Sequence, residues 1–69
     1  MSLREYRKEA GFKTQQSLAD ALGISRSMIA KWELGITVPG VFMAQKISKV
    51  LNKTEGEIIN VLKLEKIID

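Results

Sequence analysis

The sequence predicts an all-α fold of five short helices in a single domain that spans residues 1–69. Glycine and proline residues divide the chain into five segments whose apolar side chains recur at helical spacing. No segment shows the strict alternation of polar and apolar residues that is typical of a half-buried strand. Because so short a chain can bury only a small core, association with a second copy is expected.

Capping patterns place the first two helices. Ser2 and Glu5 have the spacing of a capping box, and the first helix is expected to end at Gly11. Thr14 is expected to cap the second helix, in which positions 18, 19 and 22 form an apolar stripe before Gly23 ends it.

The third helix is short and has clear limits. In the stretch ISRSMIAKWELG, Ser25 is an N-cap signal and Gly35 occupies the C′ position, where a left-handed backbone is favoured. These limits leave room for about two and a half turns at 3.6 residues per turn. Ile29 and Trp32 fall on one side of the helix, and its polar residues fall on another.

Pro39 marks the start of the fourth helix. Its expected inward-facing residues are Val41, Ala44, Ile47 and Leu51. Thr54 and Glu57 repeat the capping-box spacing, and the last helix is expected to run from about residue 55 to residue 68. Ile58 and Leu62 are expected to complete the core from that helix.

The connection between the second and third helices predicts the function. Only Gly23, Ile24 and Ser25 separate Leu22 from Arg26. A turn this tight, with Ile24 beneath it, holds two helices at a steep angle, as in a helix-turn-helix. A short helix fixed from below fits the major groove of DNA, which is about 12 Å wide. The sequence therefore predicts DNA binding.

Charge and missing residue types restrict the function further. Residues 1–53 carry nine Lys and Arg against four Asp and Glu (+5), whereas residues 54–69 carry two against four (−2). A basic body suits an anionic partner. The absence of Cys and His argues against an enzyme, and no metal, cofactor or small-molecule ligand is expected. Without a membrane-length apolar run or a signal-peptide core, a cytoplasmic protein with no membrane partner is expected.

Residues 15–34 resemble the helix-turn-helix of lambda-repressor-like, Cro-type regulators of the XRE family. The segment LREYRKEAGFKTQQSLADALGISRSMIAKWELG, followed by PGVFMAQKISKVL and TEGEII, resembles the whole five-helix domain of that family. The resemblance implies a nucleoid-associated transcriptional regulator of a bacterium or phage, with a repressor that binds palindromic operator DNA as a homodimer as the leading expectation. An antitoxin or a protein-interaction module with the same fold is the alternative.

The resemblance also implies roles for individual residues. The expected base contacts come from Arg26, Ser27 and Lys31. The candidates for contact with the DNA backbone are Lys13, Gln15, Gln16, Ser17 and Met28. Gln15 is also expected to brace Arg26. Arg7 and Glu33 occupy the positions of a partly buried ion pair that fixes the angle of the third helix.

Each DNA-binding role has a plainer alternative. Arg26 can be a solvated surface charge, Ser27 a second capping hydroxyl, and Lys31 a contact to phosphate only.

The chain also departs from the family pattern, because Lys13 is inserted before Thr14 and the loop after residue 35 lacks basic residues. Fewer basic groups there predict weaker nonspecific binding.

The last helix is expected to carry the dimer contact. It has more apolar side chains than one small core can bury on a single face. The dimer candidates are Ile59, Val61, Leu64, Ile67 and Ile68. A symmetric dimer would bind two half-sites one DNA turn apart. The alternative is a frayed C-terminus with scattered exposed apolar side chains.

Overall fold

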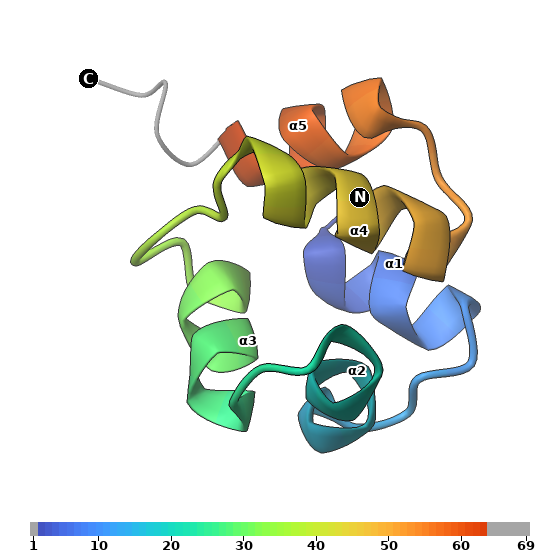
Figure 1. Ribbon diagram of the computed structural model, residues 1–69, viewed down its shortest axis with the longest axis vertical. Helices are drawn as coiled ribbons and strands as arrows, with labels where there is room; N and C mark the ends of the chain where they lie inside the picture. The colour runs from blue at the N-terminus through green and yellow to red at the C-terminus, as the bar shows by residue number, and fades with distance from the viewer. Residues whose placement is uncertain (1, 64–69) are drawn as a thin grey trace.

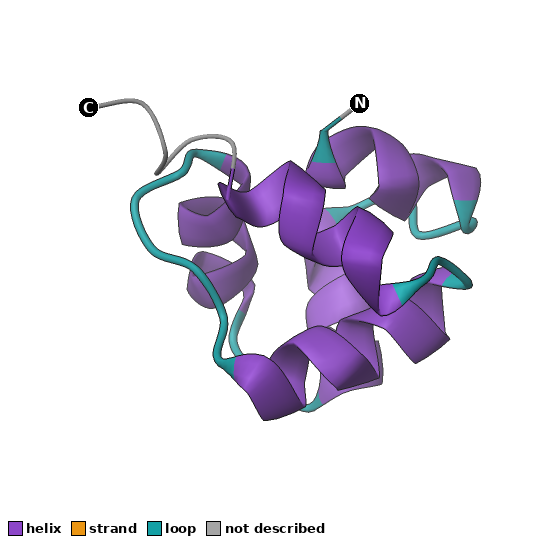
Figure 2. Ribbon diagram, turned by 90° about the horizontal axis from the view of Figure 1, so that it is seen from above, coloured by secondary structure: helices purple, strands orange, loops and turns teal. Residues whose placement is uncertain are grey.

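The computed structural model describes residues 2–63, which form five helices (Figures 1 and 2). In chain order the helices are α1 (Leu3–Glu9), α2 (Gln15–Leu22), α3 (Arg26–Glu33), α4 (Val41–Leu51) and α5 (Glu55–Lys63). The predicted all-α fold is confirmed, and residues 2–63 contain no strand. No helix in this part of the chain combines the length and apolarity needed to cross a membrane.

The helices form two pairs, in which α2 packs on α3 and α4 packs on α5. The pairs are joined by α1, which contacts α3, α4 and α5, and by a direct contact between α2 and α4. In Figure 1, α2 and α3 lie in the lower half of the molecule, and α4 and α5 lie in the upper half. The angle between α3 and the rest of the molecule is therefore set by contacts with both α1 and α2.

Three helices begin with the caps that the sequence predicts. Ser2 and Glu5 form a reciprocal capping box at α1, and Thr54 and Glu57 do the same at α5. Thr14 caps α2 together with Ser17. The predicted cap at Ser25 is wrong in one respect, because its hydroxyl makes no capping hydrogen bond and lies 3.2 Å from the Ser27 hydroxyl.

The turn between α2 and α3 depends on a left-handed residue. Gly23 has a φ of 73°, which a residue without a Cβ adopts at no steric cost. The turn is closed by the N–H of Ile24, which donates to the carbonyl of Ala19 at 3.0 Å. Lys46 on α4 adds a further contact, since its Nζ donates to the carbonyl of Leu22 at 3.2 Å. The end of α2 is thus held by α4 as well as by its own backbone.

All five helices contribute to one core. Its largest fully buried side chains are Leu18, Leu22, Ile29, Ile47, Leu51 and Ile58. The prediction that Val41 faces inward is wrong, because its side chain is 72% exposed. α4 begins at Val41 itself, so this residue lies at the outer end of the helix and beyond the edge of the core.

α5 buries three residues on one face. Ile58 and Leu62 are buried as predicted. Val61 was expected to be available to a second copy, but it is only 9% exposed and packs in the core, because α5 contacts both α4 and α1. Ile59 is exposed. The other dimer candidates, Leu64, Ile67 and Ile68, lie outside the described residues.

Candidate nucleic-acid interface

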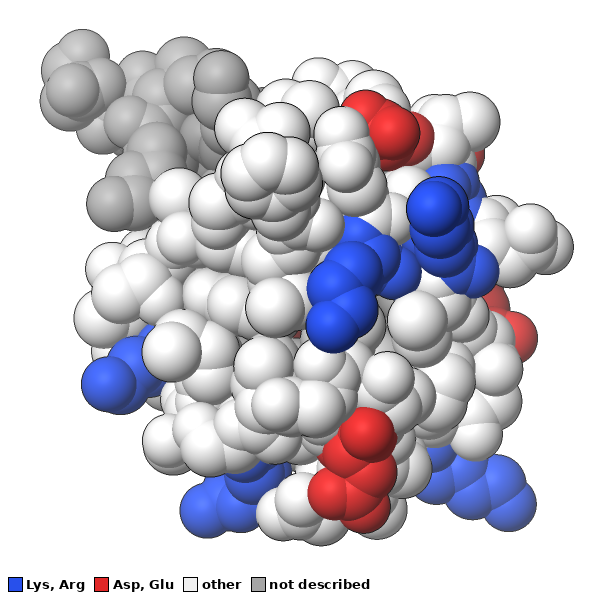
Figure 3. Space-filling view, in the orientation of Figure 1, with Lys and Arg blue, Asp and Glu red and all other residues white. Residues whose placement is uncertain are grey.

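α3 presents one polar and one apolar side. Arg26, Ser27 and Lys31 are exposed, whereas Ile29 and Trp32 are buried. The apolar side anchors the helix in the core and leaves the three polar side chains directed to solvent. In Figure 3, Lys and Arg side chains project from the lower and left edges of the molecule, over the half that contains α2 and α3.

Four side chains connect α1 to the exposed face of α3. Arg7 donates from Nε to Glu33 Oε2 at 2.8 Å, and from Nη1 to the carbonyl of Phe12 at 2.7 Å. Gln15 Nε2 donates to the second carboxylate oxygen of Glu33 at 3.0 Å. Arg26 Nη1 then donates to Gln15 Oε1 at 3.3 Å. We refer to these four side chains, Arg7, Glu33, Gln15 and Arg26, as the relay.

The relay starts at a desolvated ion pair. The side chains of Arg7 and Glu33 are only 4% and 7% exposed. Buried charges require a partner, and each carboxylate oxygen of Glu33 accepts one hydrogen bond within the relay. The pair therefore ties α1 to the C-terminal end of α3, and it also presents a fixed acceptor to Gln15.

The relay also sets which way the Gln15 amide points. Its NH2 group faces the Glu33 carboxylate and its oxygen faces the Arg26 guanidinium. The opposite orientation would place the amide oxygen against a carboxylate and the NH2 group against a cation, so it would lose both hydrogen bonds. Gln15 thus holds Arg26 at the N-terminal end of α3.

Two of the other backbone candidates have partners of their own. Gln16 Nε2 donates to Asp20 Oδ1 at 2.8 Å. The Ser17 hydroxyl donates to the carbonyl of Thr14 at 2.7 Å as part of the α2 cap. Contact with a phosphate would require the Ser17 hydroxyl to give up its bond as a donor, whereas the Gln16 NH2 group keeps a second N–H that can donate. Lys13 is exposed and forms no ion pair with the described residues.

Comparisons with known proteins agree with this geometry. Residues 3–58, from the start of α1 into α5, match the model of the helix-turn-helix family. The chain belongs to the XRE family of helix-turn-helix regulators. It is 37% identical over 60 residues to an uncharacterized HTH-type transcriptional regulator of Methanothermobacter thermautotrophicus strain Delta H, a match that covers 87% of this chain and 86% of that protein. No solved structure shows significant similarity to this chain.

As an XRE-family regulator, the chain binds DNA through its helix-turn-helix. Two contacts that support this unit were not predicted from the sequence. The Gln15–Glu33 hydrogen bond joins residues 18 positions apart, and the Lys46–Leu22 hydrogen bond joins residues 24 positions apart. Polar side chains at such separations give no local pattern, so only the tertiary structure identifies these pairs.

Proposed function

We propose that this chain is a repressor that binds double-stranded operator DNA sequence-specifically, as a homodimer on two symmetric half-sites. In this proposal α3 enters the major groove and its polar side faces the base edges. A regulator of this kind acts where the DNA is, so the proposal includes a cytoplasmic, nucleoid-associated location.

The observation that carries the proposal is the relay behind Arg26. A guanidinium is suited to the N7 and O6 acceptors of guanine, which it can contact with two parallel hydrogen bonds. Discrimination between the correct base and the others is sharper when the guanidinium is held in place before binding, because less side-chain entropy is lost on contact. Ser27 and Lys31 lie on the same exposed side of α3, where they serve the neighbouring bases.

Lys13 has a different proposed role. It precedes the capped start of α2, where a phosphate can also accept from helix N–H groups. A lysine that contacts only phosphate strengthens binding to every sequence alike. Arg26 and Lys13 therefore form a matched pair, since both are exposed cations but only one is proposed to read bases.

Selection of bound duplexes from a random DNA pool tests the proposal. The expected result is a symmetric sequence with half-sites one helical turn apart. With that sequence, Arg26→Ala should weaken specific binding by about 1–3 kcal/mol and relax the preference at one base pair in each half-site. Lys13→Ala should weaken specific and nonspecific binding equally and reduce the salt slope by about one unit.

Comparison of the two variants also separates contact with bases from nonspecific electrostatic attraction to DNA. If Arg26→Ala lowers specific and nonspecific affinity by the same factor, Arg26 contacts phosphate and the proposed base contact is wrong. If the selection returns no enriched sequence, specific binding by this chain is refuted.

A further inference from the structure

The peptide unit between Leu22 and Gly23 lies at the start of the turn that leads into α3. Its carbonyl and its N–H belong to one rigid plane, so an interaction with either group restrains both. The N–H of Gly23 donates to the carbonyl of Asp20 at 3.2 Å. The carbonyl of Leu22 accepts from Lys46 Nζ at 3.2 Å. The plane is therefore held from both sides, by α2 itself and by a side chain of α4.

Gly23 makes this turn possible but also leaves it adaptable. Its φ of 73° carries no steric cost without a Cβ, and the same lack of a Cβ leaves other backbone conformations accessible. Only Ile24 and Ser25 separate Gly23 from Arg26, so a rotation at Gly23 would change the direction in which α3 leaves the turn. The hydrogen bond from Lys46 restricts that rotation.

The cation at the end of α2 comes from another helix. The C-terminal end of a helix carries a partial negative charge and favours a nearby cation. α2 has no basic residue in its own last turn. Residues 34–45 are uncharged, and Lys46 is the first charged residue after Glu33. Lys46 thus provides an interaction that the sequence of α2 does not supply.

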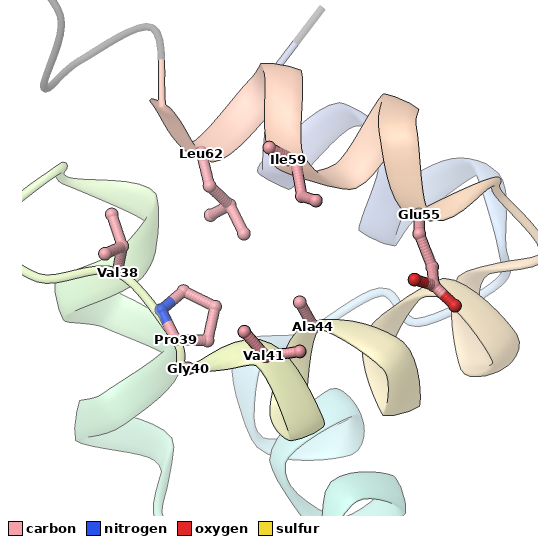
Figure 4. Close-up of a pocket in the computed structure, with 8 residues that line it drawn as sticks. All are labelled: Val38, Pro39, Gly40, Val41, Ala44, Glu55, Ile59 and Leu62. Atoms are coloured by element: carbon pink, nitrogen blue, oxygen red, sulfur yellow. The ribbon is translucent and has the colours of Figure 1, made fainter.

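α4 gives this lysine a defined position. Ala44 and Ile47 are buried, and α4 packs on α5 and also contacts α2. In Figure 4, Ala44 faces Ile59 and Leu62 of α5 across an apolar hollow, and α2 lies below α4. Lys46 follows Ala44 by two positions, which corresponds to about 200° around a helix. Its side chain therefore leaves α4 on the side of α2.

Two side-chain hydrogen bonds join the unit formed by α2 and α3 to the other helices within residues 2–63. Arg7 on α1 donates to Glu33, the last residue of α3. Lys46 donates to Leu22, the last residue of α2, which lies four positions before Arg26. α3 is thus tied to the other helices near both of its ends. The bond from Arg7 fixes where α3 ends, and the bond from Lys46 fixes where it begins.

We propose that Lys46 is a positioning residue for the recognition of DNA bases, because it holds the peptide unit before Gly23 and thereby the direction of the first turn of α3. This inference rests on the proposed function, in which Arg26 and Ser27 of that turn contact bases. Lys46 itself contacts no DNA in this proposal. Its loss should therefore reduce discrimination between bases and leave the contacts with phosphate unchanged.

Amide hydrogen exchange of the free chain tests whether Lys46 holds the turn. Lys46→Met removes the donor and keeps a straight side chain. Exchange at Gly23 and Ile24 should become about twofold to tenfold faster, as expected for the loss of one hydrogen bond. Exchange at Leu51, in the core, should not change. Lys49→Met removes an exposed charge from the same helix and should leave all three rates unchanged. Wild-type exchange at Gly23 and Ile24 in Lys46→Met would overturn the proposal.

Binding to DNA tests the effect on recognition. The specific affinity of Lys46→Met should fall by about threefold to tenfold, which is part of the discrimination that one well-placed side chain provides. The preference should relax at the base pairs that Arg26 and Ser27 are proposed to contact. Lys46→Arg keeps a donor and should restore most of the specific affinity. The nonspecific affinity and the salt slope of Lys46→Met should match those of Lys49→Met.

The outcomes separate this role from a phosphate contact and from the function on which it rests. A salt slope that falls by about one unit in Lys46→Met alone would show that Lys46 contacts phosphate, and the positioning role would be wrong. Faster exchange with full retention of base preference would also refute that role. A wild-type chain without any sequence preference would refute the proposed function, whereas a wild-type preference that survives in Lys46→Met refutes only the role of Lys46.

Discussion

The buried ion pair of the relay can be tested by removing one partner and then both. Glu33→Leu would leave the Arg7 guanidinium, whose side chain is 4% exposed, with the Phe12 carbonyl as its remaining hydrogen-bond partner. Breaking a buried pair in this way costs about 3–5 kcal/mol. A domain of this length has a total stability of roughly 3–10 kcal/mol. The single variant should therefore be largely unfolded or have a much lower denaturation midpoint.

Removal of both charges should have a different outcome. In Arg7→Met combined with Glu33→Leu, no charge remains buried, and apolar replacements of similar volume are often neutral or stabilising. The replacement leaves the Phe12 carbonyl without its donor, at a cost of about 1–3 kcal/mol. The double variant should therefore lie within about 3 kcal/mol of the wild type and remain folded.

The assay is urea unfolding followed by tryptophan fluorescence. Trp32 is the one tryptophan in the chain, it is 6% exposed, and it precedes Glu33. A constant slope of free energy against urea would show that the variants change stability and not the compactness of the unfolded chain. If Glu33→Leu alone costs less than about 1 kcal/mol, the pair behaves as an exposed one and the reasoning from burial is wrong.

The folded double variant also tests the role of the relay in DNA binding. It lacks the Glu33 carboxylate that orients Gln15, so the Arg26 guanidinium loses its fixed acceptor. We expect unchanged nonspecific binding, with the loss of part of the ~1–3 kcal/mol discrimination that a well-placed guanidinium provides. Full retention of specificity would show that Arg26 finds its place without the relay.

Two further predictions concern the turn and the start of α5. Gly23→Ala should destabilise the chain by about 1–2 kcal/mol in urea unfolding, because the left-handed backbone penalises a Cβ even though nothing lies within 4 Å of it. Gly56→Ala, inside α5, should raise the free energy of unfolding by about 0.5–1 kcal/mol. If both substitutions destabilise the chain, the left-handed backbone at Gly23 is not the cause of the loss. The backbone N–H and hydroxyl of Thr54 hold the pKa of the Glu57 carboxyl below its ordinary value of 4.5. The ionised carboxylate therefore contributes to the stability of the fold above pH 4.5, and this contribution is lost as the pH falls through the lowered pKa. Glu57→Gln should make stability less dependent on pH below about 4.5, and an unchanged acid profile would contradict this role.

The helices were predictable because their signals are local. A capping box joins residues three positions apart, and Ser2 and Thr54 form theirs as the spacing indicates. The left-handed residue at Gly23 is likewise a property of the turn alone. These features depend on the chain within one helical turn, so a correct prediction requires no knowledge of the packing.

The errors occur where packing decides. Val41 has the spacing of an inward residue, but the helix that contains it starts at that position and the core ends before it. Val61 is a different case, because it follows Ile58 by three residues and helical spacing places it on the same buried face as Ile58 and Leu62. The link from Glu33 to Gln15 was not predicted because it depends on the angle between α2 and α3.

The distribution of charge in this chain bears on the balance between specific and nonspecific binding. Basic side chains that contact phosphate strengthen binding to every DNA sequence alike. Lys31 lies on α3, and the uncharged stretch begins three residues later at Leu34. Basic residues in this loop would therefore raise nonspecific affinity without any gain in discrimination between bases. Their absence leaves a larger share of the affinity to the side chains of α3, which are proposed to read the bases.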